Sequence, residues 1–204
     1  MAANLARVEK AVTAAVNASD SYNGIPDAGS RLFLAQIDDL AITIDLQLIE
    51  DGLKNPTWAN RVDFQQSTSV AHGANLPAHT GPIDAVIIGG KLATPAPLDQ
   101  IENERDLLAQ GVTSLTPHYN ADGFVLAHNG SSNATVKSCT VTRGVVLQGP
   151  DYTEGAIIRG VLSLIASPEG EDPATQSEYA RQYALDRQAM TAGQIPPPFQ
   201  ASEQ

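Results

Sequence analysis

The sequence predicts an α+β fold: a mainly helical bundle with paired N- and C-terminal helices, a small β-rich insertion and an extended C-terminal tail. Near both ends of the chain, apolar residues recur every three or four positions, as they do on the buried face of a helix. Between residues 57 and 149, β-branched runs are broken by Pro and Gly, which is typical of strands and turns. After residue 190, three consecutive prolines, Pro196 to Pro198, exclude a helix and favour an extended polyproline segment.

Two helices are predicted in the first quarter of the chain. The first covers about residues 3–19 and has one apolar face: Leu5, Val8, Val12 and Val16. The second covers about residues 30–53, with Ser30 as a favourable N-cap. Its apolar stripe is continuous: Leu34, Ile37, Ala41, Ile44 and Leu48. Gly52 and Pro56 then end the helical pattern.

The β-rich insertion contains one embedded helix, "PLDQIENERDLLAQG", between shorter strands. The run "IDAVIIGG" predicts a strand that ends in a glycine turn. Asn129-Gly130 lies between two alternating runs and predicts a hairpin that joins them, and "GVVLQ" predicts a further strand. Residues 64–82 are long and polar for a structured insertion, so we expect an arm that orders only against neighbouring subunits.

Two more helices and a tail complete the chain, which we expect to form a single domain over residues 1–204. The helices cover about residues 150–166 and 172–190, and the second has Asp172 as its N-cap and Pro173 at its first position. The tail covers residues 191–204 and includes the proline run.

The composition excludes several classes of protein. The formal charge is -11 and the pI is about 4.6. So acidic a chain is poorly suited to gripping phosphate backbones, because that binding requires Lys and Arg to displace counterions. The single cysteine excludes an internal disulfide. Without a signal peptide or a long apolar run, we expect the chain in a reducing cytoplasm, or in a particle assembled there.

No motif predicts a catalytic, cofactor or metal site. The four histidines, His72, His79, His118 and His128, lack the spacing of zinc ligands, and the first two lie in a Pro/Gly-rich stretch where exposed loop residues are expected. Cys139 is expected to pack in a strand as a small apolar residue. "IIGGK" is too short for a phosphate loop. The three glycosylation sequons are treated as chance matches: those beginning at Asn17, Asn129 and Asn133.

Two clusters leave alternatives open. Asp99, Glu102, Glu104 and Asp106 lie in one helical segment, where a solvated face is the simpler interpretation and paired acids for glycoside hydrolysis the alternative. In the last helix, the aromatic and basic side chains could form a subunit interface or the inner stripe of that helix: Tyr179, Arg181, Tyr183 and Arg187.

The order of these elements resembles that of the head-to-tail adaptor (connector) proteins of tailed bacteriophages. Three stretches carry the resemblance: "RLFLAQIDDLAITIDLQLIEDGL", "YNADGFVLAHNGSSNATVKSCTV" and "PDYTEGAIIRGVLSLIASPEGEDPATQSEYARQYALDRQAM". The resemblance implies a homo-oligomeric ring, of twelve subunits, beneath the portal protein in the neck of the virion. The helices would line the channel through which DNA passes without specific binding, and the insertion would contact tail or nozzle proteins. The tail would contact the portal through Ile195, Pro196, Pro197, Pro198 and Phe199.

Three functions follow as hypotheses. The first is this adaptor, which predicts a ring that forms with a portal. The second is another neck or tail component, a tail terminator or nozzle protein, which predicts binding to tail proteins instead. The third is a small carbohydrate-active hydrolase that uses the carboxylates of residues 99–106. The absence of any clustered catalytic or metal-binding set in the sequence makes the adaptor, a non-enzyme, the preferred hypothesis.

Overall fold

The computed structural model confirms the mixed α+β class and divides the chain into two compact units. It describes residues 1–18, 31–71, 76, 81–112, 116–121, 125–127, 133–142, 146–165 and 173–200. The helical unit combines Met1–Asn60 with Thr142–Gln204, and the β-rich unit is Arg61–Val141. The sequence predicts one domain over residues 1–204 with an insertion at 57–149, whereas in the structure the inserted segment is a compact unit in its own right.

The predicted helices are present with small shifts at their ends. The helical unit contains α1 (Leu5–Ala18), α2 (Arg31–Leu53), α4 (Glu154–Leu164) and α5 (Pro173–Thr191). Pro173 is the first residue of α5, as expected from its fixed φ. The helix predicted at 150–166 begins instead with a 3-10 turn, η3 (Asp151–Thr153), after Pro150. Ser30 and Asp172, the predicted N-caps, lie outside the described residues.

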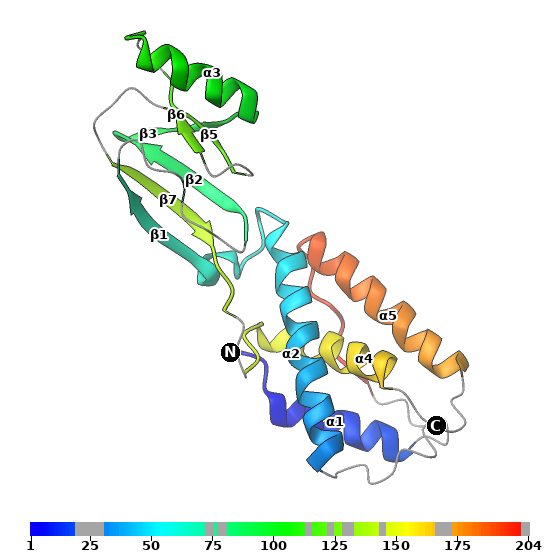
Figure 1. The fold of residues 1–204 in the computed structure, drawn as a ribbon. Coiled ribbons are helices and arrows are strands. Elements are labelled where there is room, and N and C mark those ends of the chain that lie inside the picture. The colour runs from blue at the N-terminus through cyan, green and yellow to red at the C-terminus, as the bar shows by residue number, and fades with distance from the viewer. Residues whose placement is uncertain are drawn as a thin grey trace. The chain divides into compact units, whose positions relative to one another are not determined.

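Helix α4 is the central element of the helical unit and packs against α1, α2 and α5 (Figure 1). Eight consecutive residues of α4, Gly155 to Leu162, are buried. Gly160 permits this packing, because a Cβ there would lie 2.9 Å from Ile44 Cδ1 and 3.1 Å from Tyr183 Cε2. The apolar stripes predicted for the first two helices face this core, since Val8, Val12, Ile37 and Leu48 are all fully buried. Among the described residues, no helix combines the length and apolarity needed to cross a membrane.

A buried carboxylate fixes the point where the chain returns to the helical unit. Asp45 on α2 accepts hydrogen bonds from the backbone N–H groups of Gln148 (2.7 Å) and Gly149 (3.1 Å). Burial raises the pKa of Asp45, while these two donors act in the opposite direction. Gly149 has no room for a side chain, since a Cβ there would overlap Asp45 Oδ1. The strand predicted from "GVVLQ" is wrong, because residues 146–148 have no strand structure. Leu147, which directly precedes the two donors to Asp45, is buried.

The β-rich unit contains two small sheets and one helix. The first sheet has the order β1-β7-β2-β3 and is antiparallel throughout: β1 (Gln65–Val70), β7 (Ala134–Cys139), β2 (Ile83–Ile88) and β3 (Lys91–Leu92). The second has the order β4-β5-β6, with β4 and β5 parallel: β4 (Thr94–Pro95), β5 (His118–Asn120) and β6 (Val125–Ala127). Helix α3 (Leu98–Ala109) contacts β5 and β6. The predicted glycine turn is present between β2 and β3, where both Gly89 (φ 56°) and Gly90 (φ 78°) are left-handed.

The predicted hairpin at Asn129-Gly130 is wrong. Its two flanking strands belong to different sheets: β6 pairs with β5, while β7 lies between β1 and β2. The Asn-Gly pair itself lies outside the described residues. The alternation of Ala134, Val136 and Ser138 arises because one face of β7 is buried in the core of this unit. Part of the predicted polar arm at 64–82 is β1, which pairs with β7 along its whole length.

Candidate functional site

The tail leaves α5 through a tight, glycine-dependent turn. Gln194 N–H donates to the carbonyl of Ala189 and Gly193 N–H to that of Met190, which is the hydrogen-bond pattern of a Schellman motif. Gly193 has the left-handed φ of 75° that this motif requires. The chain then runs back along α5, because the ring of Phe199 lies 6.5 Å from that of Tyr179, which is about three turns before the end of the helix. Residues 194–200 have no regular secondary structure.

The tail is held by a site formed by α4 and α5, which we call the tail cradle: Gly155 and Arg159 on α4, with Tyr179 and Asp186 on α5. Arg159 donates to the carbonyl oxygens of Pro197 (2.7 Å) and Pro198 (3.4 Å). Gly155 allows the tail backbone to approach α4, since a Cβ there would lie 2.6 Å from Phe199 N and 2.8 Å from Pro197 O. Pro196 is buried, whereas Ile195 is 68% exposed.

Asp186 on α5 orients the arginine of the cradle. Its carboxylate accepts two hydrogen bonds from Arg159, at 2.7 Å from Nε and 3.0 Å from Nη2. The side chains of Arg159 and Asp186 are only 5% and 3% exposed. Burial raises the pKa of Asp186, although the guanidinium of Arg159 favours the charged carboxylate. The bidentate pair thus fixes the plane of the guanidinium and leaves its remaining N–H groups directed at the tail carbonyls.

A groove of about 570 Å³ lies beside the tail, between α1 and the beginning of α4. Its walls are largely apolar and include Ala11, Ala14, Ile158 and the tail residues Ile195 and Phe199. Arg7 lines one side of the groove and forms an ion pair with Glu154 at 3.2 Å. The exposed part of the tail therefore contributes to a concave surface of the helical unit.

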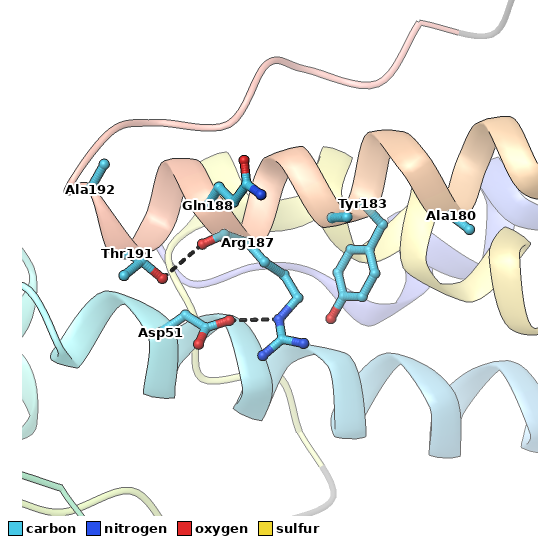
Figure 2. A pocket seen from close by; sticks show the side chains of 8 residues that line it. Asp51, Ala180, Tyr183, Arg187, Gln188, Thr191 and Ala192 are labelled. Atoms are coloured by element: carbon cyan, nitrogen blue, oxygen red, sulfur yellow. Dashed lines mark hydrogen bonds and ion pairs between the residues drawn. The ribbon is translucent and has the colours of Figure 1, made fainter.

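The four α5 residues predicted for a subunit interface do not share one environment. Tyr183 O–H donates to Gln47 Oε1 of α2 at 2.9 Å, and burial raises the pKa of this tyrosine to about 12. Arg187 donates from Nε to Asp51 Oδ2 at 2.6 Å (Figure 2). Arg181 is exposed and pairs with Glu178 on the same helix at 2.6 Å. Tyr179 and Tyr183 thus pack within the chain and are partly exposed, whereas Arg181 is exposed to solvent.

A second groove, of about 520 Å³, lies between α2 and α5 (Figure 2). Tyr183 and Arg187 line it together with small and polar residues: Asp51, Ala180, Ala184, Gln188, Thr191 and Ala192. Asp51 accepts hydrogen bonds from Arg187 and Lys54, both at 2.6 Å. Although burial alone would raise the pKa of Asp51, these two cations hold it below its usual range. A charged pair in a groove lined by small side chains is compatible with protein contact and shows no catalytic constellation.

The carboxylates considered for hydrolysis do not converge. Asp99, Glu102 and Asp106 are exposed on α3, as expected for a solvated face. Glu104 is half-buried, and its Oε2 lies 2.7 Å from Nδ1 of His118 in β5. His118 is therefore a partly buried strand residue. The contact ties α3 to the neighbouring strand.

The remaining predicted residues are Cys139 and three histidines. Cys139 is fully buried, as predicted, and burial together with its contact to Asp84 raises its pKa to about 12, so it is not a reactive thiolate. His72, His79 and His128 lie outside the described residues. Within the described part of the chain, no group of three or more His, Cys, Asp or Glu side chains could hold a metal ion.

Sequence reasoning missed Gly155, Arg159 and Asp186, the residues that hold the tail. One signal was available: Arg159 is the only charged residue in the apolar run "GAIIRGVLSLI", and a buried arginine requires an anionic or carbonyl partner. The sequence has no corresponding signal that the partner is Asp186 or the tail.

No protein-family model matches the chain, and no curated protein matches its sequence significantly.

Proposed function

We propose that this chain is a virion structural protein, the head-to-tail adaptor of a tailed bacteriophage. In this role the chain forms a ring of twelve subunits beneath the portal, lines the DNA channel and joins the capsid vertex to the tail. It is assembled in the host cytoplasm and acts in the neck of the virion. The bundle of paired N- and C-terminal helices is the part that surrounds the channel.

The observation that best supports this proposal is the way the helical unit is built from both ends of the chain. Residues 1–60 and 142–204 form one unit, and the β-rich unit is inserted between them. Such an arrangement leaves one unit to form a ring and a second, separately folded unit to contact another component. The same order of elements carries the resemblance to adaptor proteins.

The charge of the chain also supports a channel role. The formal charge is -11, and much of it lies in the helical unit, where exposed carboxylates such as Asp39 and Glu50 occur on α2. A negatively charged wall repels the DNA backbone and so does not retain DNA during its passage. A protein that gripped DNA would need the opposite charge.

The proposed portal contact is the tail, Ile195 to Phe199. In the free chain this segment lies in the tail cradle, with Ile195 exposed and Pro196 buried. We propose that the portal either packs against the exposed Ile195 or draws the whole segment out of the cradle. The proposed subunit contact is the exposed side of α5, with Arg181 and the groove that contains Tyr183 and Arg187.

The test is to mix the purified chain with a purified portal ring from the same phage and to measure the mass of each component and of the mixture by light scattering. The adaptor role predicts a complex that is heavier than the portal by about a full ring of subunits. Ile195→Ser combined with Phe199→Ala should weaken the complex, whereas Gln200→Ala, which changes an exposed residue next to the contact, should not.

The contrary outcomes are distinct. If the chain binds no portal ring but binds purified tail tube or nozzle proteins in the same assay, it is another neck or tail component. If it binds neither and stays monomeric in every mixture, the structural role is wrong, and turnover of oligosaccharides by wild type and by Glu104→Gln then tests the hydrolase alternative.

A further inference from the structure

The tail cradle has the chemistry of a binding site for a proline-rich segment. A proline-rich segment in an extended conformation leaves its carbonyl groups without intramolecular partners, and prolines have no N–H to offer. Arg159 supplies donors to two successive carbonyls, Gly155 leaves space for the backbone, and Tyr179 contacts the aromatic residue that follows the prolines. The ligand recognised is therefore an extended Pro-Pro-Pro-Phe segment.

The segment that connects α5 to the tail residues bound in the cradle is short and exposed. Gln194 and Ile195 connect the end of α5 to the buried Pro196, and both are exposed. Residue 193 is a left-handed glycine that closes α5. A change of backbone direction at residues 193–195 would therefore release the tail without disturbing the core that α2, α4 and α5 share.

We propose that the tail cradle also accepts Pro196–Phe199 from a second copy of this chain, so that copies associate by exchanging tails. Every copy carries both the cradle and the segment that fits it, so the exchanged contacts are the same as those within one chain. The balance between the two forms then depends on the effective concentration of the attached tail compared with the concentration of other copies.

The geometry restricts how such copies meet. From Gly193 to Pro196 the chain spans at most about 10 Å, since an extended residue covers about 3.3–3.6 Å. The cradle of the second copy must therefore lie close to the end of α5 of the first. The groove between α2 and α5 reaches this end of α5 at Thr191 and Ala192, whose small side chains allow close contact (Figure 2). This proposal does not require the adaptor role.

Two full-length variants test the exchange. Gly155→Ala blocks the cradle, because the added Cβ would lie 2.6 Å from Phe199 N, while alanine is the better helix former and should preserve α4. Pro196→Gly with Phe199→Ala weakens the tail and leaves the cradle intact. Sedimentation velocity of a 1:1 mixture should show a heterodimer, with an association constant at least tenfold above that of either variant alone. A synthetic peptide of residues 194–200, QIPPPFQ, should dissociate it.

The control is a third chain that carries the Gly155→Ala, Pro196→Gly and Phe199→Ala changes together. Mixed with the tail-weakened variant, it provides no intact tail and should not associate. If the first mixture also fails to associate while circular dichroism shows both variants folded, tail exchange is refuted and the cradle serves its own chain alone. If Gly155→Ala does not fold, wild type replaces it at tenfold higher concentration, and the absence of association there has the same meaning. Because no portal is present, failure of the adaptor role cannot produce either result.

Discussion

Removing Asp186 should destabilise the helical unit strongly, because it leaves Arg159 as a buried charge without its main partner. Both side chains are almost fully buried, and the pair has two hydrogen bonds of 2.7 and 3.0 Å. Breaking a buried ion pair on one side costs about 3–5 kcal/mol. The carbonyls of Pro197 and Pro198 still accept from Arg159, so we expect Asp186→Ala to cost about 3 kcal/mol, near the lower limit of that range.

The assay is urea unfolding followed by tryptophan fluorescence. The single tryptophan, Trp58, is buried in the helical unit, where its Nε1–H donates to Tyr152 at 2.7 Å, so its signal reports this unit. The midpoint should fall while the slope stays unchanged. Leu185→Ala is the matched control, because Leu185 is the adjacent α5 residue and is 50% exposed; its cost should stay within about 0.5 kcal/mol.

A double variant separates the destabilisation caused by an unpaired Arg159 from the net contribution of the ion pair to stability. Arg159→Met with Asp186→Leu replaces both charges by apolar side chains and should recover most of the lost stability, because buried ion pairs are often no better than apolar packing. The same double variant loses the donors to Pro197 and Pro198 and should hold the tail less well. The reasoning is refuted if Asp186→Ala costs less than about 1 kcal/mol, or if the double variant is as unstable as the single one.

The remaining predictions concern pH and the β-rich unit. Burial alone would raise the pKa of Asp84, but hydrogen bonds from Arg61 and Gln65 hold it below its usual value, so the stability it contributes is present above pH about 3.9 and is lost as the pH falls through the lowered pKa. Hydrogen exchange of β7 should show this loss in wild type and a smaller one in Asp84→Asn. A hydrogen bond with Asp38 raises the pKa of Glu9, so the stability that Glu9 contributes depends on pH in the opposite sense. This contribution is complete below the unfolded pKa of about 4.3 and is lost as the pH rises through the raised pKa. Urea midpoints read from Trp58 should therefore fall less with rising pH in Glu9→Gln than in wild type. Gly90→Ala should cost the β-rich unit about 1 kcal/mol through its left-handed φ, which faster thiol labelling of the buried Cys139 would report, and equal labelling rates would contradict this.

The helices of the molecule were predictable because their signals are local. The stripe from Val8 to Val16 and the longer stripe in α2 repeat at helical spacing over several turns, and the predicted ends differ from those of α1 and α2 by two residues or fewer. The turn at Gly89-Gly90 was predictable for the same reason, since it depends only on the conformational freedom of two adjacent residues.

Strand pairing was not predictable, because it depends on contacts between residues far apart in the sequence. Asn129-Gly130 indicates that a turn is allowed, but not which strands pair around it. β7 pairs with β1 and β2, which precede it by about 70 and 50 residues. The segment around Leu147 was mispredicted for the same reason. Its apolar residues suggest a strand, but the hydrogen bonds from Gln148 and Gly149 to the distant Asp45 determine its conformation.

The position of the tail connects the two proposals. A proline run excludes a helix, but it does not reveal that the segment has an acceptor in its own chain. Since Pro197 and Pro198 are already bound by Arg159, a portal that takes the whole tail must replace these hydrogen bonds and the contact with Tyr179. A neighbouring copy replaces them with identical ones, so exchange between copies has no such energetic cost. If both processes occur, Gly155→Ala should strengthen portal binding, because it frees the tail, and should weaken it only if the portal recognises the tail while it is docked on α4.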